Sequence, residues 1–94
     1  GGSIAKIKET AINGQTVVVG GIIEEIKEFN TKKGEMMAFV KIADYSGNIE
    51  AVVFPRTKTE YKEILVTENC LAIKGRMSNR NGTPSIIIEK LKVL

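Results

Sequence analysis

Histidine and tryptophan are absent from this chain, and it contains a single cysteine, Cys70. Without histidine, a histidine-based metal site, a Ser-His-Asp triad and a Cys-His dyad are all excluded. One cysteine cannot form an internal disulfide bond, and because Cys70 begins an apolar run over residues 70–73, we expect a buried, unreactive thiol. No stretch approaches the roughly 20 apolar residues of a membrane-spanning helix, and we recognise no signal peptide.

Aromatic residues are also scarce, since the chain contains only three phenylalanines and two tyrosines. Each ring therefore matters if the protein binds a partner by stacking. The net charge of +3 is compatible with a polyanionic partner but is too small to predict one. With 43% hydrophobic and 27% charged residues among 94, the composition indicates one globular domain with a thin core.

The N-terminal segment is short and mixed. Residues 1–3 (Gly-Gly-Ser) read as the remnant of an expression tag, so we expect an excised fragment whose single domain covers residues 4–94 and is monomeric in isolation. Ile4, Ile7 and Lys8 indicate one helical turn, which the turn signal at residues 13–14 (Asn-Gly) ends.

Five segments have the pattern of β-strands. The first, residues 16–29, is long and rich in β-branched side chains, and Gly20 and Gly21 in its middle suggest a bend at a barrel corner. Two short strands joined by a Gly-Gly hairpin are the alternative. The other strands are expected at residues 36–44, 48–54, 69–78 and 84–91.

A helix is expected between the third and fourth strands. Over residues 56–65, Tyr61, Ile64 and Leu65 form one apolar stripe, and Pro55 is well placed at the helix start. The element order predicts an all-β OB-fold, which is a five-stranded Greek-key barrel with one helix between strands three and four. An SH3-like barrel would not carry an amphipathic helix at that position.

We find no catalytic constellation in the sequence, and we expect neither a metal ion nor a cofactor. The carboxylates fall mostly on outward strand positions or on the exposed helix face, where solvated surface charge is their ordinary role. Asp44 precedes a turn and is expected to accept hydrogen bonds from its backbone. Gly20 and Gly21 lack the spacing and the following Lys-Ser/Thr of a phosphate-binding loop.

A binding role fits the pattern better. OB-folds bind nucleic acid across strands two and three and the flanking loops. If the small and branched residues at 38, 40 and 42 face the core, then Met37, Phe39 and Lys41 face outward. An exposed Phe39 ring can stack on a base, although a neighbouring domain covering Phe39 and Met37 is an alternative.

Cations accompany this strand in the sequence. Lys32 and Lys33 lie in the first loop, Lys74 and Arg76 share one side of the fourth strand, and Arg80 lies in the last hairpin loop. We expect these side chains to follow a phosphate backbone. Lys32 and Lys33 are equally compatible with simple solvation of a loop.

Several stretches carry a family resemblance: GGII at residues 20–23, TKKG at 31–34, MMAFVKIADYSGNIEAVVFP at 36–55, the helix around Tyr61, and IKGR at 73–76. Over about residues 16–91 they resemble the OB domain of the bacterial replicative DNA polymerase III alpha subunit. The sequence departs from a good stacking face in having Met37 where a further ring would help.

The resemblance implies an accessory domain that binds single-stranded DNA and positions the template strand for the cytoplasmic replicative polymerase, next to the polymerase's other domains. The active-site carboxylates of that family belong to another domain, so this domain is expected to have no enzymatic activity of its own. The implied contacts are Lys33, Phe39, Lys41, Arg76 and Arg80.

Two other functions remain open from the sequence. One is an anticodon-binding OB domain of a class II aminoacyl-tRNA synthetase, for which sequence-specific RNA recognition needs polar side chains directed at base edges. The outward positions here are rich in lysine and poor in asparagine and glutamine, which favours non-specific DNA binding. The other is a structural module whose barrel face docks on its parent protein.

Overall fold

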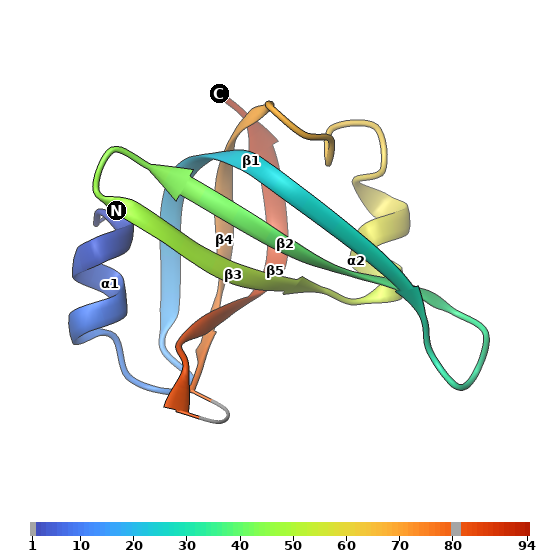
Figure 1. Cartoon of the computed structure of the whole chain (residues 1–94), viewed down its shortest axis with the longest axis horizontal. Helices are drawn as coiled ribbons and strands as arrows, with labels where there is room; N and C mark the ends of the chain where they lie inside the picture. Colours follow the sequence, from blue (N-terminus) through green and yellow to red (C-terminus); the bar gives the residue numbers. More distant parts are fainter. Residues whose placement is uncertain (1, 80–81) are drawn as a thin grey trace.

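The computed structural model describes residues 2–79 and 82–94 and shows five strands closed into a barrel (Figure 1). Around the barrel the strands lie in the order β1-β2-β3-β5-β4. Their bounds are β1 Thr16–Asn30, β2 Met36–Asp44, β3 Gly47–Val53, β4 Cys70–Ser78 and β5 Ser85–Val93. Helix α1 (Ile4–Thr10) and helix α2 (Pro55–Glu60) lie at opposite ends of the barrel, and α2 stands between β3 and β4 in the chain as predicted. The predicted OB-fold is confirmed.

Strand β1 is one long strand that belongs to two sheets. Its first part pairs with β4 and its second part with β2, and Ile22 has a partner in each, Cys70 and Ala43. The bend lies where we placed it, at Gly20 and Gly21. A Cβ atom at Gly21 would lie 2.7 Å from the Ile42 side chain and 2.8 Å from the Ala43 carbonyl oxygen. Glycine is needed at Gly21 because the β2 backbone crosses too close for any side chain.

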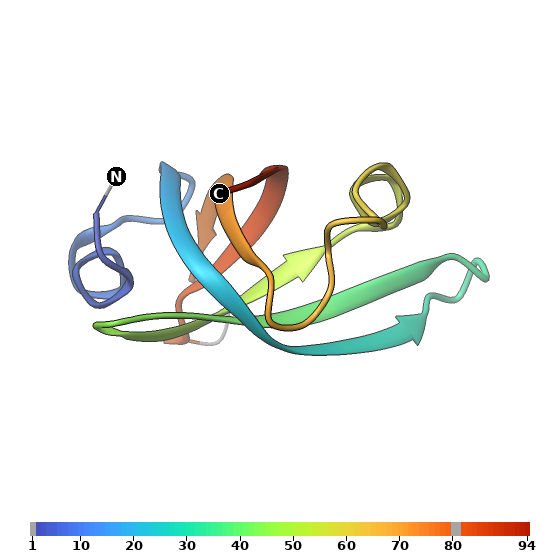
Figure 2. The same ribbon diagram turned by 90° about the horizontal axis from the view of Figure 1, so that it is seen from above.

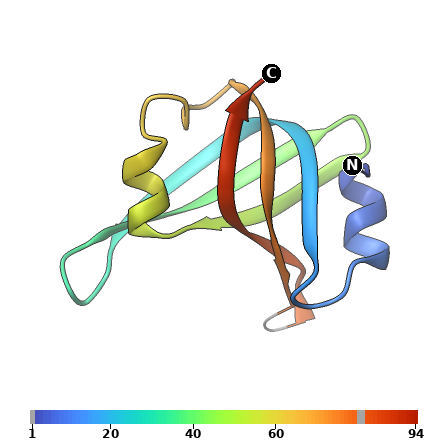
Figure 3. The same cartoon turned by 180° about the vertical axis from the view of Figure 1, so that it is seen from behind.

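The bend produces two sheets that share β1 and enclose the core. The second half of β1 with β2 and β3 forms one layer, and the first half with β4 and β5 forms the other, as Figures 2 and 3 show from above and from behind. Inward and outward residues alternate along the strands, as period-two geometry requires, except at irregularities in β1 and β5. The buried side chains are almost all aliphatic, and the largest of them are Ile4, Ile23, Ile42, Leu71, Ile73, Met77, Ile86 and Ile88.

Helix α1 is longer than the single turn expected from the sequence. A seven-residue helix is unstable alone, so tertiary contacts must hold it. Ser3, which we had set aside with the presumed tag, is its N-cap and accepts a hydrogen bond from the Lys6 backbone N–H. Ile4 and Ile7 are buried in the core, and burying an isoleucine side chain contributes about 1.5–3 kcal/mol.

Asp44 ties α1 to the turn between β2 and β3. One carboxylate oxygen accepts the Ile4 backbone N–H at 2.9 Å, and the other accepts the Ser46 backbone N–H at 2.7 Å and the Ser46 hydroxyl at 2.6 Å. The predicted turn-forming role of Asp44 is thus confirmed, and its contact with α1 is additional. Partial burial raises the pKa of Asp44, but these hydrogen bonds outweigh it, so the net pKa lies below its ordinary value.

Helix α2 is shorter than predicted, because it ends at Glu60 and not near Leu65. Tyr61 leaves the helical conformation with φ −112° and ψ 19°, and the chain continues as turns in which the Ile64 and Leu65 N–H groups both donate to the Tyr61 carbonyl. The predicted apolar stripe is still used, since Leu65 is buried and Tyr61 and Ile64 pack against the core. Tight turns bring these three residues together as a helix would.

The prediction of a buried Cys70 is wrong, because the structure places this residue at the surface. Inward and outward positions alternate along β4, and the inward ones here are Leu71 and Ile73. Cys70 occupies an outward position at the start of the strand. A short apolar run in a sequence does not reveal which of its members faces the core.

Replacing Gly21 with alanine tests the close crossing of β1 and β2. We expect Gly21→Ala to lower the free energy of unfolding by about 1–3 kcal/mol, the usual cost of forcing atoms into a packed site. The matched control is Gly20→Ala, whose new methyl would meet only the end of the Leu94 side chain, at 3.4 Å. Urea denaturation of both variants measures the difference, and an equal loss in both would contradict the argument.

The lowered pKa of Asp44 predicts an acid-dependent loss of stability. A carboxyl group whose pKa is lower when folded stabilises the fold fully above its unfolded pKa, and this contribution disappears as the pH falls through the folded pKa, below the ordinary value of 3.8. The stability difference between the parent chain and Asp44→Asn should therefore shrink in acid. Urea denaturation at neutral pH and at successively lower pH measures it, with Glu63→Gln as the control for charge removal. A difference that stays constant into strong acid would rule out this role.

Candidate nucleic-acid interface

The outer surface of β1, β2 and β3 is a set of cross-strand rows, which we call the front face. Its residues are Glu25, Lys27, Phe29, Met37, Phe39, Lys41, Glu50 and Val52. The neighbouring positions Ala38, Val40 and Ile42 are buried, so the predicted outward direction of Met37, Phe39 and Lys41 is confirmed. The family of folds predicted from the sequence uses this surface for ligands.

Two phenylalanine rings stack on each other on the front face, near the loop that joins β1 to β2. The Phe29 and Phe39 ring centroids are 4.9 Å apart with an interplanar angle of 28°. Phe29 is opposite Met37 and Phe39 is opposite Lys27, so the two rings are diagonal neighbours, within reach for aromatic side chains. Phe29 remains 37% exposed and Phe39 45% exposed. The pair is a preformed aromatic surface on which a base can stack.

Lys32 and Lys33 lie in the compact turn that joins β1 to β2. The Thr31 N–H donates to the Glu35 carbonyl at 2.7 Å, and the Thr31 hydroxyl accepts the Glu35 N–H at 3.2 Å. This loop projects beyond the barrel in Figure 1. Both lysines are exposed, and both follow closely after Phe29 in the chain.

A hollow next to this loop is lined by further cations. It lies between the start of β2 and helix α2, and its lining residues are Glu35, Met36, Pro55, Arg56, Lys58, Thr59 and Lys62. Lys58 forms an ion pair with Glu28 on β1, which attaches α2 to the β1–β2 hairpin. Arg56 and Lys62 are exposed. Glu28 and Met36 stand on the same side of the hairpin as the buried Ala38, so this hollow lies on the opposite side from Phe29 and Phe39 and is not part of the front face.

Lys41 lies in a different electrostatic setting from the loop lysines. Its cross-strand partners are Glu25 on β1 and Glu50 on β3, so a carboxylate residue stands on each side of it. Opposite charges in register attract each other and offset the field of the lysine. A phosphate is therefore attracted less strongly to this end of the front face than to the loop end.

The structure does not bring Lys74 and Arg76 together with Phe39. Both are exposed on the outer side of β4, which belongs to the other sheet and faces the opposite direction (Figures 1 and 3). Arg76 also forms an ion pair with Glu89, with an Nε–Oε2 distance of 3.0 Å. Arg80 lies outside the described residues. Of the predicted set, Lys32, Lys33, Met37, Phe39 and Lys41 share one hairpin.

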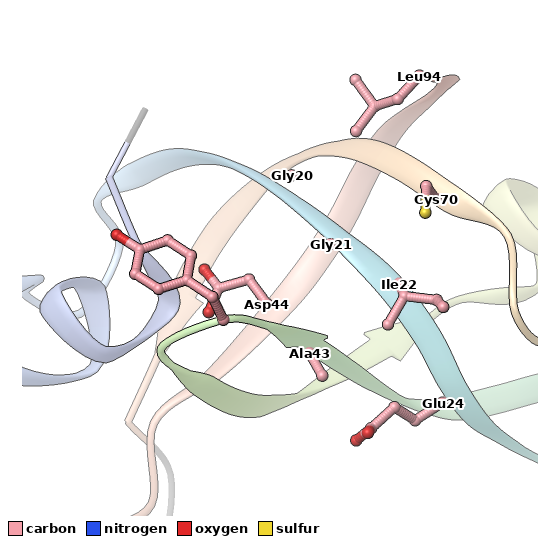
Figure 4. A pocket seen from close by; sticks show the side chains of 9 residues that line it. Gly20, Gly21, Ile22, Glu24, Ala43, Asp44, Cys70 and Leu94 are labelled. Carbon is pink, nitrogen blue, oxygen red and sulfur yellow. The ribbon is translucent and has the colours of Figure 1, made fainter.

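A second hollow lies beside the bend in β1 (Figure 4). Its polar lining includes the carboxylates of Glu24 and Asp44, and neither lysine nor arginine is among its lining residues. It therefore suits a phosphate poorly. Across the part of the chain that the structure describes, no three His, Cys, Asp or Glu side chains gather as metal ligands, and no helix is long and apolar enough to cross a membrane.

The sequence reasoning missed Phe29 as a candidate contact. The outward direction of Phe29 depends on a register shift between Ile23 and Glu25, which changes which β1 residues face outward. Simple alternation from the start of the strand does not locate that shift. A consistent signal was present all the same, since Glu25, Lys27 and Phe29 alternate at spacing two immediately before the loop.

Comparison with known proteins gives a family match and related chains. The family model described as "OB-fold nucleic acid binding domain" matches residues 17–94. The DNA polymerase III subunit alpha of Aquifex aeolicus is 40% identical over 69 residues, which is 73% of this chain and 6% of that protein. The chain thus spans about 6–7% of the length of the curated relatives it matches.

Solved structures share the fold at low sequence identity. The mitochondrial single-stranded DNA binding protein Rim1 of S. cerevisiae has a TM-score of 0.71 at 15% identity, covering 88% of this chain and 96% of that one. The asparaginyl-tRNA synthetase of Pyrococcus horikoshii has a TM-score of 0.71 at 22% identity, covering 98% of this chain and 21% of that one. At these identities the likeness concerns the fold.

A double-mutant cycle tests whether the two rings act as a pair. We expect the losses of stability in Phe29→Ala and Phe39→Ala to be non-additive by about 0.5–1.5 kcal/mol, the usual coupling of an aromatic pair. Denaturation of the parent, both single variants and the double variant measures it. The control cycle pairs Phe39→Ala with Tyr45→Ala, because the Tyr45 ring is 95% exposed on the β2–β3 turn. Additive losses in the first cycle would show that the stacking contributes nothing.

Proposed function

The chain belongs to the family of OB-fold nucleic acid binding domains, and from that premise we propose that its front face holds single-stranded DNA as part of a bacterial DNA polymerase III alpha subunit. In this proposal it is an accessory domain that positions the template strand during replication. The identity to several polymerase III alpha subunits over about three quarters of the chain supports this parent protein.

The observation that carries the proposal is the exposed Phe29–Phe39 pair on the face that OB-folds use for ligands. In single-stranded DNA the flat faces of the bases are accessible, whereas in a duplex they are stacked on each other. Stacking on an aromatic side chain contributes about 1–3 kcal/mol per base and tolerates any sequence. A domain with this platform therefore favours single strands without selecting their bases.

The charges on the front face differ between its two ends, and this difference determines where the phosphates of a bound strand should lie. The loop cations Lys32 and Lys33 follow closely after Phe29, at one end of the front face. The carboxylates of Glu25 and Glu50 lie at the other end. We propose that the phosphates run from the rings toward the loop, and that Lys41 contributes less than the loop lysines.

The rest of the proposal concerns the parent protein. This domain performs no catalysis, and polymerase chemistry belongs to other parts of the subunit. Its partners are single-stranded DNA and the neighbouring polymerase domains, in the bacterial cytoplasm, and the isolated domain is a monomer. Two rings and a few cations make a weak site, but tethering to the polymerase supplies the high effective concentration at which a weak site is occupied.

Titration of the 94-residue chain with fluorescent oligonucleotides tests the front face. We expect binding to single-stranded DNA that weakens as salt rises from about 50 to about 200 mM. Phe39→Ala should reduce the affinity about tenfold, which corresponds to about 1.4 kcal/mol of lost stacking. Lys33→Ala should reduce both the affinity and its salt dependence.

Matched variants separate the site from general effects. Tyr45→Ala removes an exposed ring from the opposite end of the front sheet, and Lys6→Ala removes an exposed charge from α1. Neither should change the affinity by more than a small factor. If the parent chain fails to bind single-stranded DNA at low salt, the proposal is wrong and a structural role remains. A strong preference for one RNA sequence would point instead to an anticodon-binding function.

A further inference from the structure

The outer side of the other sheet forms a second surface, which we call the back face. Its rows run across β1, β4 and β5 and consist of Thr16, Val18, Ala72, Lys74, Arg76, Ile87, Lys90 and Lys92. This surface points away from the front face (Figure 3). Its four cations come from β4 and β5 alone, and all four are exposed.

The lysines of the back face are arranged in register. Lys74 on β4 is the direct cross-strand partner of Lys90 on β5, and Lys92 is opposite Ala72, one row further along the same surface. Residues two apart on a strand lie on the same side, about 6.6–6.8 Å from each other. Three ammonium groups therefore stand on adjacent outward positions of the sheet.

An irregularity in the strand pairing helps to create this arrangement. The register of β4 and β5 shifts between Lys74 and Gly75, and both Glu89 and Lys90 are exposed as a result. Gly75 is buried at the shift, where a Cβ atom would lie 2.2 Å from the Ile87 carbonyl oxygen. The close approach of the two backbones fixes the position of the shift, and with it the side on which Lys90 stands.

The carboxylate next to Lys90 in the chain, Glu89, forms an ion pair of its own. Glu89 pairs with Arg76 at 3.0 Å, and the rows of the back face contain no other acidic residue. Like charges directly opposite each other in a sheet are destabilising. On the front face, by contrast, Lys27 and Lys41 are balanced by Glu25 and Glu50. The positive charge of the barrel wall is thus concentrated on the back face.

We propose that the back face is a second nucleic-acid surface, which binds the phosphate backbone and leaves the bases unread. The rows contain no aromatic residue, so the contact is made through phosphates, and single strands and duplexes are accepted alike. The front face, with its ring pair, favours single strands. The two surfaces therefore differ in chemistry, and the second does not depend on the first.

A nucleic-acid backbone fits this surface better than an acidic protein does. The core of a protein–protein interface is apolar and poor in charged residues, whereas Val18 is the one large hydrophobic residue exposed within these rows. Binding to a polyanion needs no apolar anchor, because each cation that neutralises a phosphate releases a condensed counterion. Lys74, Lys90 and Lys92 on two neighbouring strands match that requirement, and Arg76 beside them is already paired with Glu89.

The test compares the double variant Lys74→Gln/Lys90→Gln with the parent chain in titrations of duplex and single-stranded DNA over a range of salt. The slope of log affinity against log salt is negative, and for the duplex its magnitude should decrease by about 0.9 for each lysine removed, and for the single strand by about 0.7. The control Lys6→Gln/Lys8→Gln removes the same charge from α1 and should change the slopes less. The back-face variant should remain folded in thermal denaturation, because it removes a like-charge pair.

The outcomes separate this proposal from the one for the front face. Phe39→Ala should leave duplex affinity unchanged if the back face acts independently. Failure of the parent chain to bind duplex DNA at low salt, or unchanged slopes in the back-face variant, would overturn the back-face proposal. The proposal would also be overturned if the back-face variant lost affinity for single strands only. It would equally be overturned if that variant lost binding to a polyglutamate peptide while its DNA binding stayed intact. If the back-face variant binds duplexes more weakly while Phe39→Ala binds single strands as well as the parent chain does, the front-face proposal is refuted and the back-face proposal stands.

Discussion

The crossing of the β1 and β2 backbones at Gly21 is the contact on which the architecture depends. Because no side chain stands between the strands at this point, β1 can leave β4 and join β2 without a break in the chain. One strand thereby serves two sheets and closes the barrel. The core residues of both sheets then meet inside, and each sheet presents an outer surface that points away from the other.

This geometry creates the two outer surfaces, but a different local feature of the backbone determines which side chains each surface presents. On one side, the register shift between Ile23 and Glu25 turns Phe29 outward, where it meets Phe39. On the other side, the shift at Gly75 sets Lys90 opposite Lys74. In both sheets an irregularity of the ladder, and not the regular pairing, decides which functional groups come together. The Asp44 hydrogen bonds and the Lys58–Glu28 ion pair attach the two helices to this frame.

Local patterns predicted most of the fold, because the alternation of residues 36–44 and the Gly20–Gly21 pair each depend on near neighbours. The outward direction of Phe39 was predictable for the same reason. Contacts between distant segments were not: the Asp44–Ile4 hydrogen bond joins residues 40 positions apart. Alternation in the sequence also predicts that Lys74 and Arg76 lie on the same side of β4. It does not predict that this side faces away from β2, because that orientation depends on how the barrel closes. The burial of Cys70 was predicted wrongly, because an apolar run does not show which of its residues face the core and which face outward.

The strand order of the barrel also has a kinetic consequence. Strands β1, β2 and β3 are consecutive in the chain and pair through short turns, whereas β4 must find the first half of β1, and β5 must lie parallel to β3, across long intervening segments. Closing a long loop costs more entropy than closing a short one, and non-local pairing slows folding. The meander of β1, β2 and β3 is therefore favoured to assemble first. The sheet that carries the phenylalanine pair then serves as the template onto which β4 and β5 are added, and barrel closure is the late step.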